Sequence, residues 1–228
     1  MPGKYPSKSA MTLNDFTKAW PILKKQVKNL KLPWLESFAA LDRDPFKILI
    51  SCILSLRTQD KTTGAASERL FKLASAPKEL SRLPLGAVEK AIYPVGFYRV
   101  KAKTLRNISR ELIEHHDSLV PDTMEGLLSL KGVGRKTANL VLTRGFDKYG
   151  ICVDTHVHRI TNRWGLVRTK TPDKTELALR EILPKRYWKD LNGNLVAFGQ
   201  AVCQPLSPYC SKCRIEGFCE RRGVERYR

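Results

Sequence analysis

The chain has 228 residues, and its 41 Lys and Arg against 22 Asp and Glu give a formal net charge of +19. It is long enough to bury the core of one large or two small domains, and its charge predicts nucleic acid as a partner before an anionic membrane surface. No stretch approaches the length of a membrane span and residues 1–20 lack a signal-peptide apolar region, so we expect a cytoplasmic protein with no membrane partner.

Helices are the regular elements that the sequence pattern predicts in the first half of the chain. Thr12 with Asp15 is typical of a capping box and predicts a first helix there. Pro45 suits a first helical position, and residues 46–54 are apolar nearly all round, which predicts a central buried helix that contains Cys52. No segment alternates convincingly at period two, so a sheet is not expected. Shorter helical patterns follow at 64–74, 77–82 and 86–92, separated by prolines.

Gly132 and Gly134, one residue apart, follow an apolar helical turn and precede a run of good helix formers. This pattern predicts a tight hairpin between two helices, the second of which starts near Gly134. The first N–H groups of that helix lack intrahelical partners and can bind a phosphate. A glycine-capped turn between two core helices is the alternative, but Arg135 and Lys136 follow at once and favour binding of DNA phosphates.

Lys136 lies in the first turn of the predicted helix, where a cation is electrostatically disfavoured, and this makes its amine a candidate nucleophile. Asp154 follows eighteen residues later, directly before another helical pattern. A carboxylate at that position is either a helix N-cap or a group that serves the chemistry, and the local sequence fits both.

The end of the chain contains helical patterns at 155–165, 173–183 and 187–200, followed by a cysteine motif with the spacing C-x6-C-x2-C-x5-C. Four thiolates within 17 residues need a metal centre or reducing conditions to coexist. Zinc is the generic expectation for four cysteines, although thiolates suit an iron-sulfur cluster as well. The four candidate ligands are Cys203, Cys210, Cys213 and Cys219.

The motifs LKGVGRKTANLVL and VDTHVHRITNR resemble the endonuclease III family of DNA glycosylases, within the helix-hairpin-helix superfamily. The likeness runs from about residue 44 to residue 220. It implies that Lys136 is the nucleophile and that Asp154 assists it. It also implies a 4Fe-4S cluster, rather than zinc, on the four cysteines.

Three further residues are implied to contact DNA by this resemblance. The family places a Gln into the gap left by an extruded nucleotide, and Arg57 stands at that position here, with Gln59 two residues later. Phe97 matches a side chain that wedges between bases, although Phe97 taken alone is more typical of a core position than of a wedge. Gly132, Gly134 and Arg135 complete the expected DNA-binding set.

The fold implied by the resemblance is all-α and two-lobed. We expect residues 38–148 to form a helical barrel domain that contains the helix-hairpin-helix at about 126–146. Residues 1–37 are expected to supply an N-terminal helix to a cluster domain that is otherwise formed by residues 149–228, with the iron-sulfur loop at 203–219.

The activity implied is that of a bifunctional DNA glycosylase and apurinic/apyrimidinic lyase in base excision repair. It would act as a monomer, on oxidised pyrimidines in double-stranded DNA or on an abasic site, through a Schiff base on Lys136, and would be associated with the nucleoid. Two alternatives remain: a monofunctional mismatch glycosylase for adenine, uracil or thymine, and a non-catalytic helix-hairpin-helix DNA-binding protein. Mismatch relatives generally lack a lysine where Lys136 stands.

Overall fold

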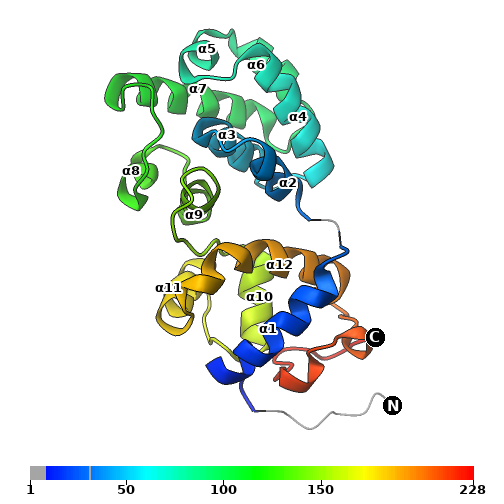
Figure 1. The fold of residues 1–228 in the computed structure, drawn as a ribbon. Coiled ribbons are helices and arrows are strands. Elements are labelled where there is room, and N and C mark those ends of the chain that lie inside the picture. Colours follow the sequence, from blue (N-terminus) through cyan, green and yellow to red (C-terminus); the bar gives the residue numbers. More distant parts are fainter. Residues whose placement is uncertain (1–8, 31) are drawn as a thin grey trace. The chain divides into compact units, whose positions relative to one another are not determined.

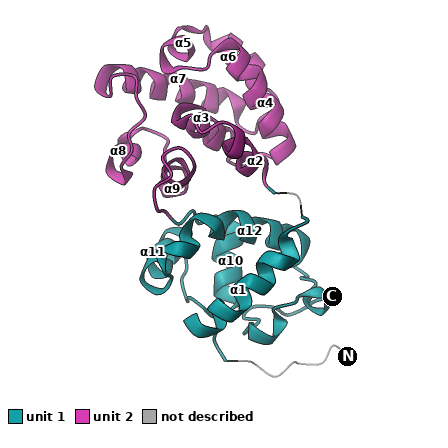
Figure 2. Ribbon diagram, viewed as in Figure 1, with its two compact units in different colours: residues 1–32, 151–228 teal, residues 33–150 magenta. Residues whose placement is uncertain are grey.

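A computed structural model describes residues 9–30 and 32–228 of the chain (Figure 1). Every regular element within these residues is an α-helix or a short 3-10 helix, which confirms the all-α prediction. The chain divides into two compact units, coloured separately in Figure 2. Unit 1 comprises residues 1–32 and 151–228, and unit 2 comprises residues 33–150. Among the described helices, none is long and apolar enough to cross a membrane.

Unit 2 is organised around α3, which packs against α2, α4, α7 and α9. Nearly every residue of α3 is buried, as its apolar composition predicts for a central helix. Cys52 is buried among them, which confirms it as a core residue. The helices of unit 2 are α2 (Trp34–Leu41), α3 (Pro45–Ser55), α4 (Asp60–Leu73), α5 (Pro77–Arg82), α6 (Leu85–Ile92), α7 (Tyr98–His115), α8 (Met124–Ser129) and α9 (Arg135–Arg144).

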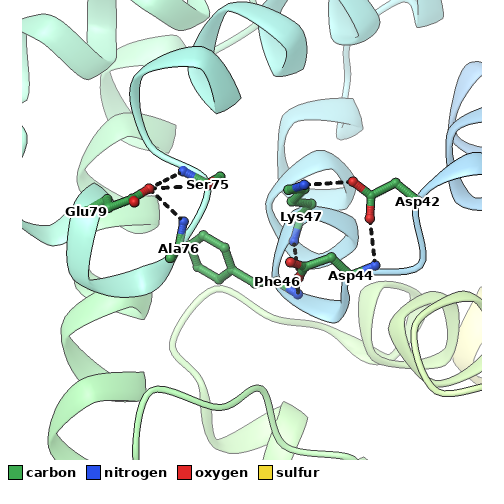
Figure 3. A network of polar contacts seen from close by, with 7 residues as sticks. All are labelled: Asp42, Asp44, Phe46, Lys47, Ser75, Ala76 and Glu79. Atoms are coloured by element: carbon green, nitrogen blue, oxygen red, sulfur yellow. Dashed lines mark hydrogen bonds and ion pairs between the residues drawn. The ribbon is translucent and has the colours of Figure 1, made fainter.

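Carboxylates satisfy the main-chain N–H groups at the starts of α3 and α5 (Figure 3). Asp44 Oδ1 accepts hydrogen bonds from the N–H groups of Phe46, at 2.8 Å, and Lys47, at 3.3 Å. At α5, Glu79 Oε2 reaches back to the N–H groups of Ser75, at 2.7 Å, and Ala76, at 3.2 Å. The Asp44 bonds satisfy first N–H groups of α3, which have no intrahelical partner, and the Glu79 bonds hold the two residues that precede α5.

Unit 1 joins the first helix of the chain to its last third, since α1 packs against α12. Aromatic side chains form much of its core: Phe16 stacks on Trp20 with ring centroids 5.3 Å apart, and meets Tyr187 edge-on at 5.1 Å. The predicted capping box at Thr12 is present. The elements of unit 1 are α1 (Leu13–Val27), α10 (Thr155–Arg163), α11 (Pro172–Ile182), η1 (Lys185–Tyr187), α12 (Trp188–Ala201), η2 (Cys210–Lys212) and η3 (Glu216–Phe218).

The boundary between the units falls before Pro33 rather than after residue 37. The reason is α2, a helix that the sequence pattern did not predict. Its N-cap is Pro33, which has no side-chain group to cap a helix and so gives no signal of a helix start. Within α2, Phe38 stacks on Phe71 of α4 at 6.0 Å, and Glu36 pairs with Arg144 of α9 at 2.6 Å. These contacts place residues 33–37 in unit 2.

Candidate functional site

The predicted hairpin is formed by α8 and α9. Between the two helices, the Val133 N–H donates a hydrogen bond to the Leu130 carbonyl oxygen at 3.0 Å. Leu130 and Val133 are buried, whereas Gly132 between them is exposed. The turn therefore fixes its apolar side chains in unit 2 and leaves glycine backbone at the surface.

The two glycines of this turn are required for different reasons. Gly132 has φ +98°, and a Cβ added there would lie 2.7 Å from Cγ2 of Thr104 on α7. Gly134 is the N-cap of α9 with φ −101°, and no described atom lies within 4 Å of an added Cβ. Gly132 thus permits the fold of the turn, while Gly134 leaves the start of α9 accessible, as phosphate binding at a helix N-terminus requires.

Lys136 and Arg135 occupy the first turn of α9, and both are half-buried. The Ala138 N–H donates to the Gly134 carbonyl oxygen at 2.9 Å and closes this turn, and the Asn139 side-chain amide donates to the Arg135 carbonyl oxygen at 3.0 Å. Lys136 therefore extends from regular helical backbone rather than from a loop. A reactive amine on such a support is held more precisely than one on a loop.

Arg57 and Phe97 come from separate loops of unit 2 and meet. The Arg57 guanidinium lies over the Phe97 ring, 5.7 Å from its centroid. Both have left-handed backbone, with φ +53° for Arg57 and +58° for Phe97. The Phe97 side chain is 63% exposed, which excludes the core position that its sequence context also allowed. Gln59 is also exposed, at the N-cap of α4, and its side chain makes no capping bond.

Lys101 is buried next to the loop that carries Arg57, and the sequence pattern did not indicate that it would be buried. It is only 7% exposed, and its ammonium donates to the carbonyl oxygens of Leu54, at 2.8 Å, and Leu56, at 2.5 Å, and to the Thr58 hydroxyl at 3.1 Å. Burial lowers the pKa of Lys101 to about 8. Lys101 precedes Leu105 by one helical turn, so both lie on the apolar face of α7. This spacing is the sequence signal that could have indicated a buried Lys101.

Asp154, in unit 1, is the N-cap of α10. Its Oδ1 accepts hydrogen bonds from the N–H groups of His156 and Val157, both at 2.9 Å. The capping function that the sequence allowed is therefore present, and it uses one carboxylate oxygen. Capping does not conflict with a catalytic function, because the carboxylate retains its charge while it accepts these bonds. Lys136 lies in unit 2.

Two arginines of α10 hold the segment that contains the first cysteine of the motif. Arg159 Nη2 donates to the Cys203 carbonyl oxygen at 2.9 Å. Arg163 Nη1 donates to the Gln204 carbonyl oxygen at 2.6 Å and contacts the Cys203 sulfur at 3.4 Å. The helix that Asp154 begins is thus tied by its side chains to the cysteine loop. Sequence reasoning missed both arginines, because helical spacing alone does not show which segment packs alongside.

The four cysteines of the motif line one pocket of unit 1. Burial raises the pKa of the Cys213 thiol to about 12 and of the Cys219 thiol to about 11. The Cys219 sulfur accepts a hydrogen bond from the Arg221 N–H at 3.3 Å. Nowhere in residues 9–30 and 32–228 do three or more His, Cys, Asp or Glu side chains form a group arranged to hold a metal ion. The pocket nevertheless brings together the donor set expected from the motif.

Comparison with known proteins gives a consistent result. A family model described as "HhH-GPD superfamily base excision DNA repair protein" matches residues 50–185. Endonuclease III of Thermotoga maritima is 47% identical over 185 residues, covering 80% of this chain and 87% of that protein. Chloroplastic endonuclease III homolog 2 of Arabidopsis thaliana is 43% identical over 183 residues, covering 76% of this chain and 47% of that protein. This chain therefore spans about half the length of the plant protein.

A solved structure of a trapped endonuclease III–DNA covalent intermediate, in an estranged-adenine complex, is similar in fold. Its TM-score with this chain is 0.82 at 30% sequence identity, over 92% of this chain and 96% of the other. The likeness therefore extends over nearly all of both chains.

The two hairpin glycines differ in backbone conformation and in surroundings, so alanine should affect thermal stability differently at each. Gly132→Ala should lower the thermal unfolding midpoint by about 2–8 °C, because a left-handed conformation costs alanine about 1–2 kcal/mol and the new Cβ meets Thr104. Gly134→Ala should leave the midpoint within about 2 °C of the parent. Circular dichroism melts measure both, and equal midpoints for the two variants would contradict this account.

Proposed function

This chain belongs to the endonuclease III family of DNA glycosylases and apurinic/apyrimidinic lyases, and on that premise we propose that it removes oxidised pyrimidines from duplex DNA through a Schiff base on Lys136. The observation that carries the proposal is the hairpin, which supports Lys136 directly after an exposed glycine turn suited to bind phosphate. We further propose that the protein acts as a monomer on DNA in the cytoplasm.

Binding of DNA is supported by the basic face of α7. Arg99, Lys103, Arg106 and Arg110 are spaced at helical repeats, so they share one side of the helix. The buried side chains of α7, among them Leu105, lie on another side. A row of cations on a rigid helix neutralises phosphates and binds them without reading sequence.

The chemistry begins when the damaged nucleotide is rotated out of the duplex, which costs a few kcal/mol and least for a damaged base. Phe97 and Arg57 fill the gap that it leaves. The Lys136 amine then forms a bond to C1′ of the deoxyribose, and the bond from C1′ to the base breaks, with its electron pair and a proton leaving on the base. Opening of the sugar ring gives the Schiff base, and loss of a proton from C2′ expels the 3′ phosphate.

Asp154 stabilises the positive charge that builds on the sugar as the base departs. Its carboxylate is fixed by the two N–H groups at the start of α10, so little reorganisation is needed as that charge develops. Because only one oxygen takes part in capping, the carboxylate is able to support the fold and the reaction together.

We also propose that Cys203, Cys210, Cys213 and Cys219 ligate a 4Fe-4S cluster. The donor set fits, because four cysteine thiolates are the usual ligands of such a cluster and all four line one pocket. Bound thiolates would also remove the cost of burying these groups, since coordination replaces the lost hydration. When bound, the cluster would stabilise the loop, which the side chains of α10 join to the rest of unit 1.

Replacing the proposed nucleophile tests the mechanism directly. Lys136→Gln should abolish the covalent adduct that borohydride traps on DNA with an abasic site, because no amine remains to form the Schiff base. It should still bind that DNA, since one phosphate contact among many costs little. Lys131→Gln, in the same hairpin, is the charge-matched control and should be trapped normally. A parent protein that gives no adduct would favour the monofunctional alternative.

Asp154→Asn separates the capping function from the catalytic one. Asn caps a helix about as well as Asp, so the thermal midpoint should change little. The single-turnover glycosylase rate should fall by at least about 100-fold through loss of the negative charge. Asp154→Ala, which loses cap and charge together, should also lower the midpoint. If Asp154→Asn were as fast as the parent, Asp154 would be a cap alone.

Metal analysis of anaerobically purified protein checks the cofactor. About four iron atoms per chain are expected, the content of the cubane cluster. Cys203→Ala and Cys213→Ala should yield poorly soluble protein, because metal binding and folding of the loop are coupled. Cys52→Ala and Cys152→Ala, outside the loop, should keep the parent iron content. One zinc per chain without iron would refute the assignment.

A further inference from the structure

The loops that carry Arg57 and Phe97 are in direct contact within unit 2. The Gly96 N–H donates a hydrogen bond to the Thr58 hydroxyl at 3.2 Å. A Cβ added to Gly96 would lie 2.6 Å from the Arg57 carbonyl oxygen, so the close approach of the two backbones requires glycine. Together with the contact between guanidinium and ring, this makes Arg57 and Phe97 neighbours before any DNA is bound.

This arrangement has to be held in place from outside the two loops. Left-handed backbone costs a residue other than glycine about 1–2 kcal/mol, and Arg57 and Phe97 both adopt it. Such conformations persist only where surrounding contacts determine them. The Arg57 and Phe97 side chains are both exposed, so they contribute few such contacts of their own.

Lys101 supplies the missing contacts. Its ammonium has three protons and meets three acceptors, the Leu54 and Leu56 carbonyl oxygens and the Thr58 hydroxyl. Leu56 is the C-cap of α3, so these bonds satisfy carbonyls that the end of the helix leaves without intrahelical partners. The Thr58 hydroxyl also accepts from Gly96, which links Lys101 to the loop of Phe97 through a single oxygen.

We propose that Lys101 is a positioning residue for base extrusion. It holds the loops of Arg57 and Phe97 together in one arrangement before DNA binds. The inference rests on the gap-filling function proposed above for those two side chains. Lys101 is buried and acts through the main chain around Thr58, so it need not touch DNA itself. Ordering the two loops in advance removes an entropic cost that would otherwise be met when the nucleotide is extruded.

Two variants disrupt this network at different points. Lys101→Met keeps an unbranched side chain that is one atom shorter and removes all three donors, while Thr58→Val removes the shared hydroxyl and leaves Lys101 in place. Thr58→Ser keeps a hydroxyl at this position and is the matched control for Thr58→Val. Lys72→Met, at an exposed position on α4, controls for the loss of one positive charge. Thermal melts establish which variants are folded.

The rates to compare are base removal from a duplex containing thymine glycol, a ring-oxidised pyrimidine, and strand cleavage at a preformed abasic site. Lys101→Met and Thr58→Val should lower the first by at least about tenfold, equivalent to about 1.4 kcal/mol. The second should fall less than about threefold, because extrusion is easiest where no base has to be unstacked. Thr58→Ser and Lys72→Met should match the parent in both.

Hydrogen exchange of segments 54–58 and 93–97, without DNA, separates the two parts of the inference. Faster exchange in Lys101→Met and Thr58→Val, together with the selective loss of base removal, supports it. Unchanged exchange, or an equal loss of both activities in folded variants, would overturn the positioning function of Lys101. Faster exchange with unchanged rates would instead show that the gap-filling function itself is wrong, as would a Phe97→Ala variant with the parent rate.

Discussion

The pairing of one buried ammonium with the carbonyls at the end of α3 is the interaction on which the loops that carry Arg57 and Phe97 depend. A helix terminates with carbonyl groups that have no partner within it, and an apolar surrounding makes each of them costly to leave unmatched. Lys101, from the first turn of α7, supplies the matching donors. The helix α3 therefore ends at a fixed point, and the loop that follows has a defined direction.

In unit 1, charged side chains likewise satisfy main-chain groups that lack a partner within a helix or loop. The Asp154 carboxylate satisfies the N–H groups at the start of α10, and the guanidinium groups of Arg159 and Arg163 satisfy carbonyls of the cysteine loop further along. A single helix thus has the acidic group at its N-cap and supports the cysteine loop through its side chains.

Local signals in the sequence were sufficient for most of the helices and for the hairpin. The bounds of α5 agree with the predicted range 77–82, since proline and Glu79 mark its start, and the glycine pair indicated the turn before α9. Contacts between distant segments were beyond such signals. Neither the meeting of Arg57 with Phe97 nor the acceptors around Lys101 has any trace in local periodicity, because each depends on how α3 and α7 pack.

The exposure of Phe97 has an energetic consequence of its own. A phenyl ring kept in water retains its unfavourable hydration, roughly 25 cal/mol for each Å² of apolar surface, and that free energy is released only when the ring finds an apolar environment. Stacked bases offer none until they separate. On the gap-filling function proposed for Phe97, this side chain contributes affinity only at a base step that already separates readily, and contact with a fully stacked duplex would leave the ring in water.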